Sequence, residues 1–306
     1  MDEDELDCLI VGGGPAGLTA AIYLARFHLS VTLVDAGRGR ASWIPCTRNV
    51  PGFPDGISGE ELLARMRAQA EKYGVSLASG RVTRLDRAGS GFSAEWGEGR
   101  AQAHTVLLAT GIRNRRPDMD EELHDEALAR GLIRYCPICD GYEVTDRKLG
   151  VIGSGDHGVA EALFLRSYSA DITLIAPDKS HALATEDRER LEAHGIAALD
   201  GPARGVAVQQ NCIVVETAEG HHVFDSVYPA LGSDLNSELA DQIGVTLNQE
   251  TGCILVDAHQ RTNVRGVYAA GDVVIGLDQI SHAMGEGGVA ATAIRNDLAA
   301  ERPLIR

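Results

Sequence analysis

A glycine-rich turn near the N-terminus constrains the fold more than any other feature. Residues 6–11 predict a short apolar strand, residues 18–27 have the apolar spacing of a helix, and residues 31–34 predict a second strand that ends in Asp35. Glycines allow a tight turn and the close approach of a phosphate, while an acid about 20 residues further on can bind a ribose hydroxyl. The turn consists of Gly12, Gly13, Gly14, Pro15, Ala16 and Gly17. This segment therefore predicts a dinucleotide-binding unit.

The same pattern occurs again at an offset of 141 residues, from Gly12 to Gly153. Residues 148–152 and 172–175 predict strands, and residues 159–168 predict the helix between them. The second turn contains Gly153, Ser154, Gly155, Asp156, His157 and Gly158. Agreement of turns and strands in one register predicts an α/β fold with two dinucleotide-binding, Rossmann-like domains.

The second copy lacks the usual contacts for a nicotinamide cofactor. Asp35 corresponds to Ala176, so no acid stands where a ribose 2′-hydroxyl would be bound, and residues 176–181 contain no arginine for a 2′-phosphate. Lys179 and His181 are partial substitutes without the planar fork of arginine. We expect this domain to have the fold without the usual cofactor contacts.

Cys136 and Cys139 are the candidate reactive groups. Two cysteines three apart can close a disulfide, and a thiolate forms more easily in such a pair, so the pair can cycle between dithiol and disulfide. Asp140 follows at once and can exchange the proton if its pKa lies near the working pH. The alternatives are an inert pair or half of a zinc site, which needs two more ligands. The other cysteines are scattered singly at Cys8, Cys46, Cys212 and Cys253. The pattern favours redox chemistry.

Three further segments supply candidate cofactor contacts. Residues 38–58 are rich in proline and glycine and predict a loop at the end of the sheet, where cofactor contacts collect. In this loop Trp43 can stack on a bound ring or pack in the core, and Asn49 can form a hydrogen bond. The strand predicted over residues 105–109 runs into Thr110 and Gly111. A later strand of small residues ends in Gly271 and Asp272, where the acid can bind a ribityl or phosphate group.

Charge and composition exclude several classes of protein. Against 28 Lys and Arg stand 44 Asp and Glu, a net charge of −16, which argues against nucleic-acid binding through a basic surface. Residues 1–5 carry no basic n-region, and no run approaches the ~20 apolar residues of a membrane span. The arginines at 113–116 predict a solvated linker face. Together with one close cysteine pair, these features predict a cytoplasmic protein that binds neither membrane nor nucleic acid.

Taken together, five motifs resemble the low-molecular-weight thioredoxin reductase family over nearly the whole chain. They are residues 12–17, 109–111, 136–141, 153–155 and 269–272. The resemblance implies three-layer ββα domains, with an FAD-binding domain formed by residues 1–116 and 248–306. Residues 117–247 would be an inserted NAD(P)-binding-like domain that carries the dithiol. It also implies a homodimer, in which one domain swings to present the dithiol alternately to the flavin and to a protein disulfide.

The resemblance also implies roles for individual residues. Cys139 would lie next to the flavin, Cys136 would attack the partner disulfide, and Asp140 would be the acid/base, whereas the cysteine pattern alone does not order the two sulfurs. The implied FAD contacts are Gly12, Gly14, Pro15, Ala16, Gly17, Asp35, Trp43, Asn49, Thr110, Gly111, Gly271, Asp272, Gln279 and Ile280. Gly153, Gly155 and Gly158 would form the second nucleotide site.

Two departures from the family concern the electron donor. The family's basic His-Arg-Arg run, which binds NADPH, aligns with residues 176–178, and its Arg-Gln near the C-terminus aligns with Asp278 and Gln279. We therefore predict an FAD-dependent disulfide oxidoreductase acting on a thioredoxin-like protein or a small disulfide, without the usual hold on NADPH. Alternatives are a ferredoxin-type donor, a second flavin, a dithiol oxidase that uses oxygen, or a non-enzymatic redox sensor.

Overall fold

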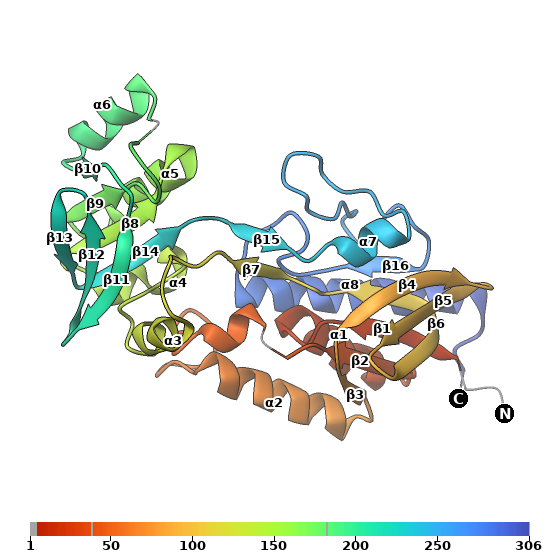
Figure 1. The fold of residues 1–306 in the computed structure, drawn as a ribbon. Coiled ribbons are helices and arrows are strands. Elements are labelled where there is room, and N and C mark those ends of the chain that lie inside the picture. Colours follow the sequence, from red (N-terminus) through yellow and green to blue (C-terminus); the bar gives the residue numbers. More distant parts are fainter. Residues whose placement is uncertain (1–4, 38, 182, 306) are drawn as a thin grey trace.

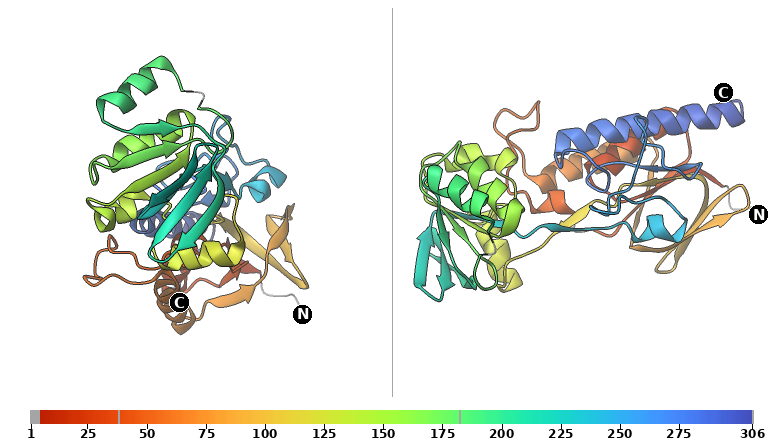
Figure 2. Two further views of the ribbon diagram at one scale, coloured as in Figure 1. Left: turned by 60° about the vertical axis from the view of Figure 1, so that its left-hand side comes forward. Right: turned by 90° about the horizontal axis from the view of Figure 1, so that it is seen from above.

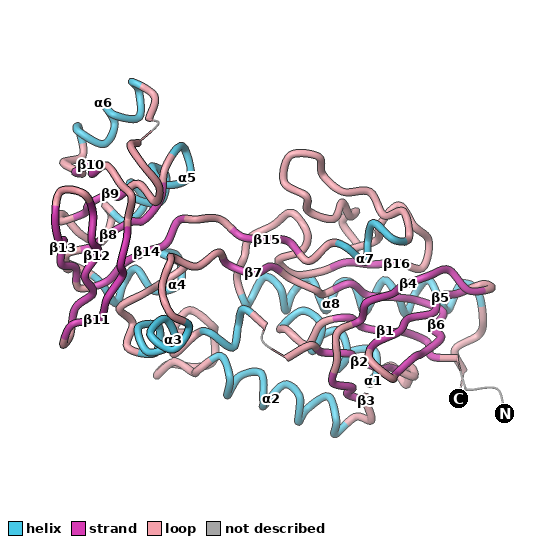
Figure 3. The backbone as a smooth tube through the Cα atoms, viewed as in Figure 1, coloured by secondary structure: helices cyan, strands magenta, loops and turns pink. Residues whose placement is uncertain are grey.

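Two bodies joined by a narrow connection make up the molecule (Figure 1). The computed structural model describes residues 5–37, 39–181 and 183–305. The connection consists of loops that carry two short antiparallel strands, β7 (Ile112–Asn114) and β15 (Ser233–Leu235) (Figure 3). Seen from above, the bodies lie at opposite ends of an elongated molecule (Figure 2).

The first body is built on a seven-stranded sheet in which β6 pairs with β1, β5 and β16. Its parallel strands are β1 (Leu6–Val11), β2 (Val31–Asp35), β3 (Ser76–Ser79), β6 (Gly99–Leu108) and β16 (Val267–Ala269). The antiparallel strands are β4 (Val82–Ala88) and β5 (Gly91–Trp96). The helices of the body are α1 (Pro15–Arg26), α2 (Gly59–Lys72), α8 (Ile280–Glu301) and the 3₁₀ turn η1 (Arg40–Trp43).

Alternation along β1 separates the layers of this body. Cys8 and Ile10 pack in one hydrophobic cluster with α1, α2 and α8, whereas Leu9 and Val11 pack in another with β4 and β5. Successive side chains of a strand point to opposite faces of the sheet, so one strand contributes to both clusters. Cys8, Leu9, Ile10 and Val11 are all buried, and the arrangement is the expected three-layer ββα architecture.

The second body repeats this plan with a four-stranded parallel sheet in the order β10-β9-β8-β14. Its strands are β8 (Leu149–Gly153), β9 (Ile172–Ile175), β10 (Ala197–Leu199) and β14 (Ser226–Ala230), with an antiparallel sheet of β11 (Arg204–Gln209), β12 (Cys212–Thr217) and β13 (Gly220–Phe224). Its helices are α3 (Glu121–Ala129), α4 (Pro137–Asp140), η2 (Gly141–Val144), α5 (Gly155–Leu165) and α6 (Thr185–Ala193).

The two copies agree in detail, which confirms the predicted α/β fold class. Strand β1 lies between β2 and β6, and β8 lies between β9 and β14. In both copies the last glycine of the turn lets the helix approach the strand. A Cβ on Gly17 would lie 2.0 Å from the carbonyl oxygen of Gly12, and a Cβ on Gly158 would lie 2.7 Å from the carbonyl carbon of Gly153.

Part of the segment assigned to the inserted domain packs in the first body instead. Helix α7 (Glu238–Gln242) and the residues after it contribute Leu239, Ala240, Ile243 and Val245 to the cluster that contains β4 and β5. The chain therefore joins the first core about ten residues before residue 248, because these apolar side chains find their partners there.

The sequence predicts a strand over residues 252–256 and a last helix over residues 279–294, and the structure differs at both. Residues 252–256 form no regular strand, since Ile254 makes only isolated bridges to Leu247 and Val274. The last helix continues to Glu301 as α8. Buried Leu298 extends its apolar side, so packing prolongs the helix.

None of the helices in the described ranges combines sufficient length with sufficient apolar character to cross a membrane.

Candidate active site

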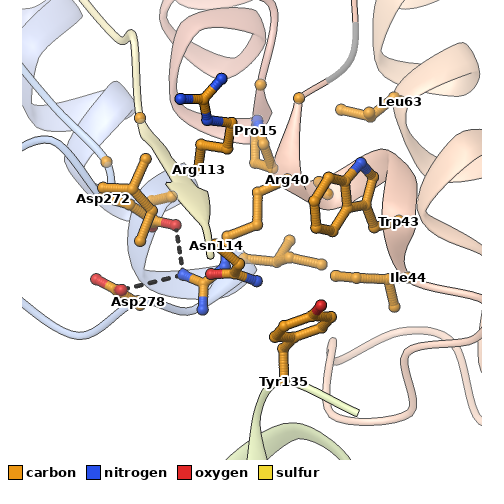
Figure 4. Close-up of a pocket in the computed structure, with 18 of the residues that line it drawn as sticks. Pro15, Arg40, Trp43, Ile44, Leu63, Arg113, Asn114, Tyr135, Asp272 and Asp278 are labelled. Carbon is orange, nitrogen blue, oxygen red and sulfur yellow. Dashed lines mark hydrogen bonds and ion pairs between the residues drawn. The ribbon is translucent and has the colours of Figure 1, made fainter. Parts of the chain in front are cut away.

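A cavity of about 1010 Å³ runs from the first glycine turn to the cysteine pair. Figure 4 shows part of its lining, including Pro15, Trp43 and Asp272. The size of the cavity is at the upper end of ligand pockets, which measure roughly 300–1,000 Å³. The predicted residues that line it are Gly12, Gly14, Pro15, Ala16, Asp35, Trp43, Asn49, Thr110, Gly111, Cys136, Cys139, Asp140, Gly271, Asp272, Gln279 and Ile280. Gly17 does not line the cavity because it packs against Gly12.

The glycine turn leaves room for a phosphate at the start of α1. Gly14 caps the helix without a side-chain hydrogen bond, and a Cβ there would meet nothing within 4 Å. Gly12 has φ +112°, and a Cβ on it would lie 2.1 Å from the carbonyl oxygen of Ala109. Free N–H groups at a helix N-terminus bind anions, so the turn fits the pyrophosphate of FAD.

Asp35 presents a fixed carboxylate at the end of β2. Its Oδ1 accepts a hydrogen bond from the backbone N–H of Gly37 at 3.1 Å, and its Oδ2 is paired with Arg67 Nη2 at 2.9 Å. A Cβ on Gly13 would lie 2.4 Å from Asp35 Oδ2, so a larger residue there would displace this acid. The position fits the ribose contact of an adenine dinucleotide.

Two acids at the opposite wall of the cavity share one arginine. Arg40 Nη1 lies 2.9 Å from Asp272 Oδ2 and 3.0 Å from Asp278 Oδ2 (Figure 4). Burial raises the pKa of Asp278, and the charge of Asp272 raises it further, while Arg40 opposes both. The sequence pointed to Asp272 but not to Arg40, since nothing distinguishes this arginine from other loop residues.

The cysteine pair faces the cavity as a disulfide. Cys136 precedes α4, its Sγ is bonded to Cys139 Sγ, and the two Cα atoms are 5.2 Å apart. Cys136 Sγ also accepts a hydrogen bond of 3.2 Å from the backbone N–H of Cys139. Across the gap between the two bodies, Gln279 Nε2 lies 3.3 Å from each sulfur. Among the described residues, no group of three or more His, Cys, Asp or Glu side chains could bind a metal ion.

Asp140 lies behind the disulfide in a hydrogen-bonded pocket. Tyr228 donates its hydroxyl to Oδ1 at 2.9 Å, and Arg134 Nη1 lies 3.0 Å from Oδ2. Burial raises the pKa of Asp140 above its ordinary value, although Arg134 and the bond from Tyr228 oppose this. The carboxyl thus retains a proton to higher pH than an exposed aspartate does.

A second, half-buried acid, Glu161 on α5, interacts electrostatically with Asp140. Burial raises the pKa of Glu161 to about 7, the charge of Asp140 raises it further, and Arg40 opposes both. Sequence reasoning missed Glu161, Arg134 and Tyr228, because their only signal is a place in the assembled fold rather than a local motif.

Trp43 contacts the inserted domain. Its ring packs edge-on against His124 with centroids 5.5 Å apart, lies 6.0 Å from the ring of Tyr135, and is covered by the Arg116 guanidinium at 4.3 Å. His124 Nε2 is 2.7 Å from the Tyr135 hydroxyl, and burial lowers the pKa of this histidine. Trp43 therefore joins the two bodies as well as lining the cavity.

The second glycine turn has the expected backbone but different surroundings. Gly153 ends β8, and Gly155 begins α5 with φ +58°. At the end of β9, Lys179 is exposed but His181 is buried, with Nε2 3.3 Å from the carbonyl oxygen of Leu174. The expectation that His181 substitutes for a phosphate-binding residue is therefore wrong, since its ring packs inside the domain.

Comparison with known proteins identifies the class to which this fold and site belong. Residues 6–287 match the family model described as pyridine nucleotide-disulphide oxidoreductase, and the chain belongs to this family. Its relatives within this family include thioredoxin reductases. A thioredoxin reductase from Treponema pallidum is 32% identical over 304 residues, covering 95% of this chain and 96% of that protein.

Solved structures agree with this assignment. A thioredoxin reductase from Streptococcus pyogenes has a TM-score of 0.87 at 29% identity, covering 97% of this chain and 99% of that one. The structure of a protein named HlmI has a TM-score of 0.89 at 30% identity, covering 98% of this chain and 95% of that one. The chain is a thioredoxin reductase-like FAD oxidoreductase that acts on a sulfur group.

Proposed function

We propose that the enzyme moves electrons between FAD and an external disulfide through Cys136 and Cys139. The observation that carries this proposal is the position of the disulfide in the same cavity as the first glycine turn. FAD bound there supplies two-electron chemistry that amino-acid side chains lack. The fit of the turn, of Asp35 and of Asp272 supports FAD as the bound cofactor.

The two cysteines have different roles in the proposal. The Cys136 thiolate attacks a sulfur of the partner disulfide and forms a mixed disulfide, while the partner's other sulfur leaves as a thiolate. Cys139 then attacks Cys136 Sγ, which restores the internal disulfide and releases the second partner sulfur. This order follows the family pattern, in which Cys139 is the sulfur next to the flavin.

Asp140 provides the proton that the leaving sulfur takes up. Its burial favours the protonated carboxyl, while Arg134 and Tyr228 keep it oriented. A general acid works best when its pKa is near the operating pH. Tyr228 and Arg134 are therefore positioning residues in this proposal.

A thioredoxin-like protein is the proposed external partner, with a small disulfide as the alternative. Support comes from the names of the relatives from Treponema pallidum and Streptococcus pyogenes, both called thioredoxin reductases. We also propose a domain swing, because the disulfide faces the cavity here and must turn outward to meet a protein. The proposed homodimer rests on the resemblance to the family.

NADPH is not bound in the family's usual way in this proposal. Ala176 is buried, and the exposed residues after it, Asp178 and Lys179, offer one negative and one positive charge. A 2′-phosphate beside Asp178 would be repelled rather than paired. A ferredoxin-type donor or a second flavin would supply electrons without this contact.

The position of the disulfide in the cavity also supports a second candidate function. If electrons enter from a dithiol substrate rather than from a nucleotide, the enzyme is a dithiol oxidase that passes them through FAD to oxygen. The lack of arginines at the end of β9 favours this reading over NADPH-driven reduction. Consumption of oxygen on addition of dithiothreitol, without any nicotinamide, would distinguish it.

Serine substitutions test the proposed function directly. Cys136→Ser and Cys139→Ser should each abolish oxygen consumption with dithiothreitol as donor, and each should abolish the anaerobic reoxidation of photoreduced FAD by thioredoxin disulfide. Cys212→Ser is the matched control, because this cysteine lies in the antiparallel sheet of the inserted domain and should leave turnover unchanged. Full activity in both test variants would refute the proposal.

A further inference from the structure

We propose that Gln279 is a catalytic residue whose side-chain amide stabilises the thiolate formed when the disulfide opens. This inference rests on the proposed function, because it concerns the same cysteine pair. Gln279 was expected only as a flavin contact, yet its Nε2 lies 3.3 Å from Cys136 Sγ and 3.3 Å from Cys139 Sγ. One donor from the first body thus reaches both sulfurs of the second.

The orientation of the Gln279 amide is fixed by a chain of hydrogen bonds. Asn49 Nδ2 donates to Gln279 Oε1 at 2.8 Å, and the Thr47 hydroxyl lies 2.9 Å from Asn49 Oδ1. With its oxygen accepting from Asn49, the Gln279 amide directs Nε2 toward both sulfurs, while Oε1 lies 3.6 Å from Cys139 Sγ. The carbonyl oxygen of Asp278 accepts from the same nitrogen at 3.0 Å. Thr47 is buried, so the first residue in this series of hydrogen bonds is held in place by packing.

The position of Gln279 in the fold also limits its movement. It is the N-cap residue of α8, and its backbone carbonyl accepts a hydrogen bond of 2.9 Å from the N–H of Ala283. The side chain therefore projects from a fixed helix end rather than from a free loop. The two sulfurs approach it from α4, so the contact exists only while the inserted domain faces the cavity.

The hydrogen bond from Gln279 Nε2 to sulfur becomes stronger when the disulfide opens. A dithiol substrate transfers two electrons to the pair, the Sγ–Sγ bond breaks, and the substrate closes its own disulfide. Of the two substrate protons, one stays on a cysteine as a thiol and the other leaves to solvent, so the second cysteine is a thiolate. Hydrogen bonds to an ionised acceptor are roughly twice as strong as neutral ones. Gln279 therefore stabilises the reduced, singly ionised pair more than the disulfide.

Two substitutions with opposite chemistry test the role of Gln279. Gln279→Leu removes the donor, and Gln279→Glu replaces it with a negative acceptor of the same size. We expect the equilibrium with dithiothreitol to shift toward the disulfide by about tenfold in Gln279→Leu and further in Gln279→Glu. The holoenzyme is equilibrated with reduced and oxidised dithiothreitol and then alkylated, and the thiols are counted by mass.

The pH dependence of alkylation separates this role from a structural one. Loss of the donor should move the alkylation of the reduced pair to higher pH, by about one pH unit in Gln279→Leu. Asn49→Leu, which frees the Gln279 amide to turn, should shift the profile in the same direction by less. Gln209→Leu is the control, since this exposed glutamine at the end of β11 is remote from the cysteine pair in sequence and lies outside the cavity.

An unchanged equilibrium and alkylation profile in both Gln279 variants would overturn the inference while leaving the proposed function intact. A wild-type pair that stays oxidised in excess dithiothreitol would overturn both. Loss of turnover in the serine variants tests the proposed function alone, so the two failures are distinguishable.

Discussion

The two glycine turns of this chain have the same fold and different surroundings. The first opens into a cavity with Asp35 and Asp272 in its walls. The second ends beside buried Ala176 and His181, with Asp178 at the surface. A duplicated strand-turn-helix unit therefore sets the backbone, whereas the residues at the strand ends decide what the unit binds.

The inserted copy carries reactive side chains that have no counterpart in the first copy. It carries Cys136, Cys139 and Asp140 on and beside the short helix α4, and it supplies Arg134 and Tyr228 to orient the acid. In the proposed function, one copy holds the cofactor, and the other carries the groups that react with an external disulfide.

Removal of the acid from the inserted copy should have the largest effect. Asp140→Asn keeps the shape of the side chain but cannot donate a carboxyl proton, and we expect turnover with a disulfide to fall at least ~100-fold. Steady-state rates between pH 5 and 9 provide the measurement. Asp178→Asn is the matched control at the surface, and equal losses in both variants would contradict the assignment of Asp140.

The difference between the turns is tested by one substitution in each helix cap. Gly14→Val places a side chain in the open space of the first turn, where phosphate contacts are worth ~1.5–3 kcal/mol each, so FAD should bind at least about tenfold more weakly. Ser154→Val places the same side chain at the cap of α5 and should leave FAD affinity unchanged. Fluorescence titration of apoprotein with FAD measures both. Equal FAD affinities in the two variants would contradict the proposal that only the first turn binds FAD.

A gain of NADPH affinity in the second copy provides the converse test. Pro177→Arg combined with Asp178→Arg introduces two arginines where residues 176–181 have none, and a guanidinium pairs with phosphate through two parallel hydrogen bonds. We expect NADPH affinity to rise about tenfold or more, with little change for NADH. Calorimetric titration measures both cofactors, and an equal gain for NADH would show that the 2′-phosphate is not involved.

The smallest expected effect concerns stability. The folded pKa of Glu161 is raised to about 7, so the folded chain binds more protons than the unfolded one between its ordinary value and pH 7. The free energy of unfolding should therefore fall as pH rises through this window. Glu161→Gln removes that fall and should be about 1–2 kcal/mol more stable than wild type at pH 8, with little difference at pH 4.5. Urea denaturation at both pH values measures the difference. A variant less stable at pH 8 would refute the raised pKa.

The sequence predicted the features that depend on local pattern. Apolar periodicity and glycine spacing placed α1, α5 and their neighbouring strands, since a tight turn between strand and helix needs residues such as Gly12 and Gly17. The dithiol and the acid after it are likewise visible as neighbours along the chain.

Features that depend on assembly could not be predicted in this way. Tyr228 is 88 residues from Asp140, and Asn49 is 230 residues from Gln279, so no local pattern indicates that their side chains meet. The domain boundary near residue 238 depends on which core receives Leu239 and Ile243, and both cores are apolar. Burial of His181 likewise follows from packing of the finished domain.

Anaerobic mixing tests the central claim most directly. The enzyme is mixed with dithiothreitol or with NADPH, and the flavin absorbance is followed in wild type and in Cys139→Ser. The account predicts that dithiothreitol bleaches wild type, that this bleaching is lost in the variant, and that NADPH acts slowly on both. Rapid bleaching by NADPH, or bleaching by dithiothreitol that does not need Cys139, would contradict it.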